Sequence, residues 1–159
     1  MTRIAIVGAG RIGGNLARLY AAAGHDITVS FARDQDKLSA LAAQIGAAAA
    51  LNSAKTPQAT RVKAFNTLTA GFQASSAGRT GPDRVVIFYA TDHDDVVLAV
   101  ERLINDVGFD PVRTGTLART EAGHQEPKGD LYGEEFHHED AAAAVGRLRG
   151  TPPSGRGRP

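Results

Sequence analysis

The sequence predicts an α/β protein with a mostly parallel sheet and flanking helices. Three observations lead to this prediction. Apolar residues 4–7 run into a glycine-rich turn and then a helical pattern, and residues 27–31 again place a strand pattern before a helical one. Residues 85–89 are continuously apolar, which is typical of a strand covered on both faces. Strands that alternate with helices in this way define the α/β class.

The first two helices are each predicted from an apolar face and a glycine at the end. Residues 11–23 form the first helix, which ends at Gly24, and a second helix follows Asp34 and ends at Gly46. Residues 47–60 give no clear signal, because an alanine run is followed by a proline that ends any preceding helix.

The second half of the chain continues the alternation less regularly. Residues 61–66 are predicted as a strand, and a short helical turn follows them. Residues 75–83 are predicted as a loop because they are rich in Ser, Gly and Pro. A helix is predicted over residues 93–107, with Thr91 or Asp92 as its cap and Gly108 as its end. A strand around Val112 and a helix near residues 139–148 complete the predicted elements.

Composition limits the class of protein. The 159 residues suit one domain, and we expect it to span residues 1–149, followed by a disordered tail over residues 150–159. The net charge of +1 creates no global field for nucleic acid or an anionic membrane. The absence of cysteine suits a reducing cytosol, and no apolar run approaches the roughly 18–20 residues of a membrane span. We therefore expect a cytoplasmic protein with neither nucleic-acid nor membrane partners.

The glycine-rich turn has the G-x-G-x-x-G spacing of a dinucleotide-binding fingerprint. Gly8 permits the tight turn, and Gly10 lets the backbone approach a pyrophosphate. Gly13 lets the helix pack closely, so that its N-terminal N–H groups point at the phosphates. The turn follows an apolar strand and precedes a helix, as the fingerprint requires. The sequence therefore predicts a Rossmann-like fold and a phosphate-binding loop made of Gly8, Ala9, Gly10, Arg11, Ile12 and Gly13.

The end of the second strand indicates which dinucleotide binds. NAD sites usually carry a carboxylate there to hold the ribose 2′-OH, but no carboxylate precedes Arg33. A guanidinium can bind a 2′-phosphate through two charge-assisted hydrogen bonds, Ser30 can donate another, and Lys37 adds positive charge. The predicted cofactor is NADP, bound by an NADP-binding Rossmann-like domain.

Two clusters of acidic and histidine residues have simpler explanations than a metal site. The acids of residues 92–95 are typical of a helix start, where they favour the helix dipole. The adjacent histidines of residues 137–140 would face different directions on a helix. We therefore predict no metal site.

The chain resembles the NADPH-dependent coenzyme F-420 reductases, a family of deazaflavin-linked NADP oxidoreductases. The matching segments are Gly8-Ala9-Gly10-Arg11-Ile12-Gly13-Gly14, Ala23-Gly24-His25-Asp26, Ala32-Arg33-Asp34 with Lys37, Val62-Lys63-Ala64-Phe65-Asn66-Thr67, Gly108-Phe109-Asp110-Pro111-Val112, Gln125-Glu126-Pro127 and Leu131-Tyr132-Gly133. The V-K-A-F-N-T segment is the more specific match, because the glycine motif is shared with many families.

The resemblance implies hydride transfer between NADPH and a deazaflavin or flavin-like acceptor. It gives Arg33 and Lys37 the 2′-phosphate role, and it places Asn66 and Thr67 in the substrate pocket on the nicotinamide side. Ala32 stands where relatives often have a hydroxyl residue. Hydride transfer needs no nucleophile or general base beyond the cofactor, so the sequence assigns no catalytic residue.

The chain departs from these relatives between the second helix and the V-K-A-F-N-T segment. Relatives have two further strand segments there, and this chain has only residues 47–60. Residues 61–66 are therefore expected beside the first strand, giving the sheet order second, first, 61–66, 84–89, with a homodimer formed through the remaining apolar surface. Two alternatives to an active oxidoreductase follow: a non-catalytic NADP-binding module, or a subunit that a partner completes.

Overall fold

The computed structural model describes residues 1–30, 35–50, 60–118 and 123–148. The chain divides into two compact units, residues 1–58 and 59–159. The single domain over residues 1–149 stays a prediction, and the predicted tail at residues 150–159 lies outside the described residues. None of the helices in the described ranges has the length and apolar character of a membrane span.

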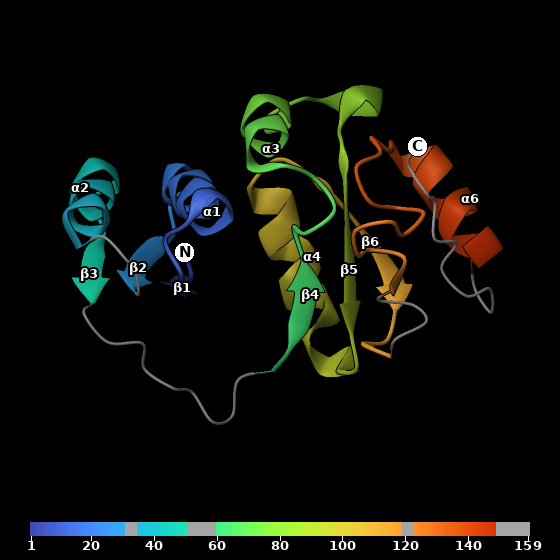
Figure 1. The fold of residues 1–159 in the computed structure, drawn as a ribbon, viewed down its shortest axis with the longest axis horizontal. Helices are drawn as coiled ribbons and strands as arrows, with labels where there is room; N and C mark the ends of the chain where they lie inside the picture. The colour runs from blue at the N-terminus through green and yellow to red at the C-terminus, as the bar shows by residue number, and fades with distance from the viewer. Residues whose placement is uncertain (31–34, 51–59, 119–122, 149–159) are drawn as a thin grey trace. The chain divides into compact units, whose positions relative to one another are not determined.

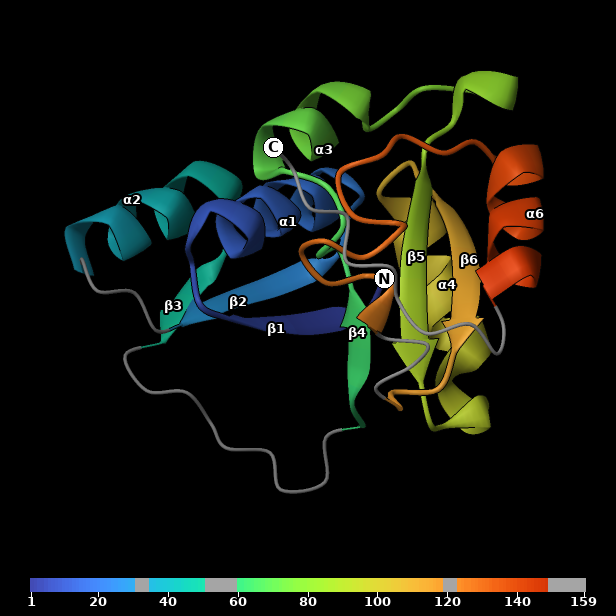
Figure 2. The same ribbon diagram turned by 45° about the vertical axis from the view of Figure 1, so that its right-hand side comes forward.

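The first unit is a three-stranded parallel sheet with two helices. Its elements are β1 (Arg3–Val7), α1 (Arg11–Ala22), β2 (Asp26–Ser30), α2 (Gln35–Ile45) and β3 (Ala48–Ala50), and its strand order is β1-β2-β3. Both helices lie on the same side of this sheet (Figures 1 and 2). The apolar alternation of β2 buries Ile27 and Val29, and the apolar stripe of α2 buries Leu38 and Leu41.

The second unit is a mixed sheet with helices around it. Its elements are β4 (Val62–Ala64), α3 (Ala70–Ser76), the 3₁₀ turn η1 (Gly81–Asp83), β5 (Val86–Thr91), the 3₁₀ turn η2 (Asp94–Val96), α4 (Val97–Asp106), β6 (Asp110–Gly115) and α6 (His138–Leu148). In the order β4-β5-β6, β5 runs antiparallel to β4 and parallel to β6. With the first sheet, this confirms the predicted α/β class.

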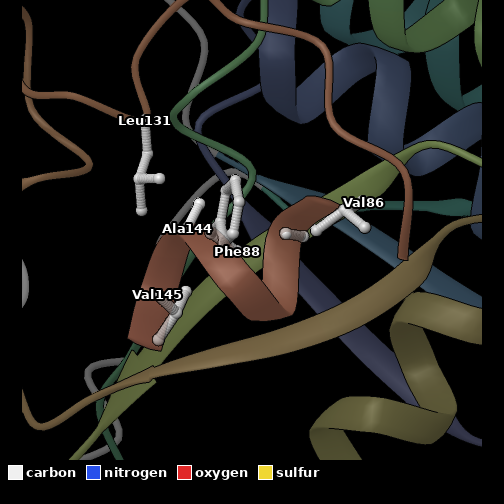
Figure 3. Close-up of a cluster of buried hydrophobic side chains, with 6 residues drawn as sticks. Val86, Phe88, Leu131, Ala144 and Val145 are labelled. Carbon is white, nitrogen blue, oxygen red and sulfur yellow. The ribbon is translucent and has the colours of Figure 1, made fainter. Parts of the chain in front are cut away.

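The core of the second unit is built around β5, every residue of which is buried. Val86 and Phe88 point to one face, where α6 packs Ala144 and Val145 against them (Figure 3). Tyr89 points to the other face, where its hydroxyl donates a 2.7 Å hydrogen bond to the Glu101 side chain of α4. The continuous apolar run of the sequence thus corresponds to a strand covered on both faces.

Two local predictions need correction. Residues 75 and 76 belong to α3, although the polar composition predicted a loop from residue 75. This helix forms because the Thr69 side chain accepts a hydrogen bond from the Phe72 backbone N–H and so caps it. The predicted cap of α4 is also wrong. Asp92 accepts a 2.8 Å hydrogen bond from the Leu117 N–H instead, and α4 begins only after η2.

The predicted sheet order does not match the observed strand pairing. In the described residues, β1 pairs only with β2, and β4 pairs only with β5. The first sheet gains its third strand from the alanine run, because β3 pairs with β2 from Thr28↔Ala48 to Ser30↔Ala50. β4 is bound antiparallel to β5, with Val62 opposite Thr91. The prediction missed β3 because alanine has low β-propensity, so pattern alone does not reveal this strand.

Replacing Phe88 tests the importance of the core around β5. Because the ring is 1% exposed and packs within the α6 cluster, we expect Phe88→Ala to lower the free energy of unfolding by about 3–5 kcal/mol. The matched control is Leu98→Ala, since Leu98 is 81% exposed and its truncation should change stability by less than about 0.5 kcal/mol. Urea denaturation followed by circular dichroism measures both. Equal losses from the two variants would contradict this packing.

Tyr89 should titrate only at strongly alkaline pH. Burial, and then its hydrogen bond with Glu101, raise the pKa of Tyr89 well above its usual range. A raised pKa means that Tyr89 contributes stability below about pH 10 and that this contribution is lost as pH rises further, since the unfolded chain ionises first.

We therefore expect folded wild-type protein and Tyr89→Phe to show the same phenolate absorbance near pH 10. Above that pH, the stability of the wild type should fall more steeply than that of the variant. An extra phenolate in folded wild-type protein near pH 10 would contradict the buried hydrogen bond.

Candidate functional site

The predicted phosphate-binding loop has the strand–turn–helix geometry that the fingerprint requires. β1 ends at Val7, and Gly8 turns the chain with a φ of +105°, a conformation that side chains other than glycine rarely adopt. The Gly8 N–H donates a 2.9 Å hydrogen bond to the carbonyl of Ser30, which ties the loop to the end of β2. Gly10 then caps α1 without any side-chain hydrogen bond. The first N–H groups of α1 therefore begin directly after the loop.

The three glycines of the fingerprint have different structural roles. A Cβ on Gly13 would overlap the carbonyl of Gly8 and lie 3.3 Å from Cγ2 of Ile6, so only glycine allows this contact between helix and strand. A Cβ on Gly10 would meet nothing within 4 Å. Open space at Gly10, next to the N-terminus of α1, is what a pyrophosphate needs in order to approach the backbone. The loop therefore fits a dinucleotide.

Two of the three residues predicted to recognise the 2′-phosphate lie at the end of β2 and the start of α2. Ser30 ends β2 and is 5% exposed. Lys37 is exposed in the first turn of α2. Arg33 lies outside the described residues.

The predicted pocket residues, Asn66 and Thr67, lie in a tight turn of the second unit. This Asn66 turn, residues 65–68, follows β4 and leads to α3. Asn66 donates a 2.7 Å hydrogen bond from Nδ2 to the carbonyl of Gln125, which leaves its buried Oδ1 with no partner among the described residues. Thr67 is 2% exposed, and its carbonyl accepts a 2.8 Å hydrogen bond from the Gly133 N–H.

Residues 123–133 form a loop that supports the Asn66 turn. Inside this loop, the Leu131 N–H donates to the His124 carbonyl at 3.0 Å, and His124 Nδ1 lies 2.9 Å from the Asp130 carboxylate. Gly129 is required, because a Cβ there would overlap the carbonyl of His124. An ion pair between Lys63 and Glu126 links the loop to β4. These contacts give a fixed shape to a segment that the sequence predicted only as irregular.

Sequence reasoning missed two buried side-chain amides beside the Asn66 turn. Gln125 is fully buried, and its Nε2 donates to Thr114 Oγ1 at 2.8 Å. Gln73 is fully buried as well and donates to two carbonyls of the turn. The Q-E-P segment signals the first of them, since it matches the family pattern. The sequence has no comparable signal for Gln73, because glutamine is usually exposed.

The predicted site residues therefore fall into two groups. The first unit contains the glycine loop, Ser30 and Lys37, and the second contains Asn66 and Thr67. Both groups lie within residues 3–70, which match a family model described as "NADP oxidoreductase coenzyme F420-dependent". The sequence resemblance is confirmed. The part of the chain that holds every predicted site residue is similar to this family of NAD(P)-dependent oxidoreductases.

Solved structures support the same fold. A hypothetical protein, SMa0349 from Sinorhizobium meliloti, is 24% identical with a TM-score of 0.68, over 87% of this chain and 96% of that one. A hypothesised F420-dependent NADP reductase from Arthrobacter sp. FB24 is 16% identical with a TM-score of 0.57, over 75% and 87%. The V8 variant of an imine reductase from Myxococcus stipitatus, solved with NAD+, is 14% identical with a TM-score of 0.53, over 94% and 60%. No curated protein matches the chain. At these identities the likeness shows the fold alone, a Rossmann-like α/β fold.

The open space at Gly10 gives a direct test of the phosphate-binding loop. Gly10→Val should abolish NADPH binding and leave the fold intact, because a Cβ there meets no protein atom within 4 Å and the branched side chain would occupy the position of the pyrophosphate. Gly71→Val is the matched control, since a Cβ at Gly71 also meets nothing within 4 Å and lies in the second unit. Fluorescence titration with NADPH measures both. A folded Gly10→Val protein that keeps wild-type affinity would make the loop a purely structural turn.

Proposed function

We propose that the protein is an NADP-dependent oxidoreductase that transfers hydride between NADPH and a deazaflavin, coenzyme F-420 or a similar flavin-like acceptor. The observation that carries the proposal is the glycine loop. Gly13 is fixed by contact with Gly8, and Gly10 leaves the N-terminus of α1 open to a diphosphate. The family match over residues 3–70 supports the reaction class.

Each predicted residue has a role in this proposal. The backbone of residues 8–13 binds the pyrophosphate, and Ser30, Arg33 and Lys37 select the 2′-phosphate. NADPH supplies the hydride. Asn66 is assigned to the acceptor, and its unpartnered Oδ1 is available to accept a hydrogen bond from a ring N–H of that molecule. Thr67 supports that residue from within the turn.

The chain's own contribution to the reaction is to position the reactants. Hydride transfer needs the two reacting rings in contact and water excluded, and it needs no side-chain nucleophile. The Asn66 turn suits this task, because its side-chain and backbone groups are held by hydrogen bonds of 2.7 and 2.8 Å to residues 125 and 133.

A non-catalytic NADP-binding module is the second candidate. It is favoured by the short connection between α2 and β4, in which the described residues contain only the three-residue strand β3. The resemblance to the family implies two strand segments in this place. A subunit that a partner completes would explain the same feature, and both a homodimer and a cytoplasmic location stay predictions.

Steady-state oxidation of NADPH separates these candidates. The purified protein is mixed with NADPH and with coenzyme F-420, FMN or a ferric chelate, and absorbance at the NADPH band is followed. Turnover with a deazaflavin or flavin supports the oxidoreductase. NADPH binding with no turnover of any acceptor supports the non-catalytic module.

Cofactor preference tests the role of Arg33. Arg33→Asp should reverse the preference from NADPH to NADH, because it removes a charge-assisted phosphate contact and adds repulsion. The contact is worth on the order of 1.5–3 kcal/mol, or roughly 10- to 150-fold in NADPH affinity. Arg102→Asp makes the same charge change on an exposed side chain of α4 and should leave both affinities unchanged. Equal binding of NADH and NADPH by the wild-type protein would refute the assignment of Arg33.

A further inference from the structure

Gln73 is fully buried, and in the described part of the chain both hydrogen bonds of its side chain lead to the Asn66 turn. Its Nε2 donates to the carbonyl of Phe65 at 3.0 Å and to the carbonyl of Leu68 at 2.9 Å. Those residues are the first and last of the turn, so one amide group joins its two ends. Burial of an amide is unfavourable unless it is hydrogen-bonded. Both N–H donors of this amide are used, while its buried Oε1 has no partner among the described residues.

The turn needs such a restraint because its backbone is strained. Phe65 has a φ of +60°, a left-handed conformation that a bulky residue rarely adopts. Its ring is 7% exposed and meets the ring of Phe109 edge-on, with centroids 6.3 Å apart. A strained residue persists only where surrounding contacts determine its conformation, and such strain often marks a functional site.

We propose that Gln73 is a positioning residue, which holds Asn66 and Thr67 in place for the hydride acceptor. This inference rests on the proposed function. Gln73 acts through the backbone of the turn, since its own amide donors are used by Phe65 and Leu68.

The structure also shows why Gln73 is the appropriate residue to change. The other restraints on the turn use backbone atoms of residues 125 and 133, which accept from Asn66 and donate to Thr67. A substitution does not remove those atoms. The Gln73 restraint comes from a side chain, so it can be removed without altering the 123–133 loop.

A purely structural role for Gln73 makes a different prediction, and Ser76 provides the comparison. Ser76 lies on the same helix and is also fully buried, but its hydroxyl donates at 2.7 Å to the carbonyl of Phe72 within that helix. Ser76→Ala therefore removes a buried hydrogen bond from α3 and leaves the Asn66 turn with all of its contacts.

The test compares Gln73→Met with Ser76→Ala by NMR and by kinetics. In Gln73→Met we expect hydrogen exchange at the Gly133 N–H, which is bonded to Thr67, to be about tenfold faster, and the Asn66 side-chain amide resonances to shift. We also expect the KM for the acceptor to rise about tenfold while the dissociation constant for NADPH stays within about twofold. Ser76→Ala should leave all of these values at the wild-type level.

A second variant covers the case in which Gln73→Met does not fold. Gln73→Glu keeps the shape of the side chain, but its carboxylate has no donor for the two carbonyls. The protonated carboxyl has one donor, so protection at the Gly133 N–H should approach the wild-type value as pH falls. If Gln73 only filled space in the core, protection at the Gly133 N–H in Gln73→Glu would not rise as pH falls.

Two results would overturn the proposal. One is wild-type exchange at Gly133 together with a wild-type acceptor KM in a folded Gln73 variant, and the other is the same set of changes in Ser76→Ala. If the wild-type protein reduces no acceptor at all, the proposed function fails, and the exchange measurements still decide whether Gln73 positions the turn.

Discussion

The complete burial of β5 is the constraint on which the second unit depends. A strand buried along its whole length must have both edges paired and both faces covered, since unpaired backbone groups and exposed apolar side chains are each unfavourable. β4 and β6 pair with its edges, and α6 covers the face of Phe88. The pairing also fixes where β4 ends, because Ala64 lies opposite Tyr89. The position of the Asn66 turn, which begins one residue later, therefore follows from the packing of β5.

The sequence predicted the structure at positions where the backbone accepts only one type of residue. Glycine at positions 8 and 13 is required by a positive φ and by a close contact, so the phosphate-binding loop could be predicted. It was uninformative where tertiary contacts decide the structure. β3 is formed by an alanine run that only its pairing with β2 makes a strand. Gln73 lies in a seven-residue helix, which is too short for a clear periodicity to mark it as buried.

The groups that hold the Asn66 turn have a chemical property in common. Asn66, Gln73 and Gln125 all carry neutral amides, and the remaining contacts to the turn are backbone hydrogen bonds. None of these groups gains or loses a proton in the physiological range. The hydrogen bonds of the turn itself therefore involve neutral groups, which suits a reaction in which the cofactor supplies the chemistry and the protein supplies the geometry.

The covering of β5 by α6 has a consequence for synthesis on the ribosome. Chains emerge from the N-terminus, and α6, at His138–Leu148, follows β5 only after α4, β6 and the 123–133 loop. During that interval the apolar face with Val86 and Phe88 lacks the helix that later buries it. Nascent chains at this stage expose that apolar face, which favours aggregation and capture by chaperones until α6 has been synthesised.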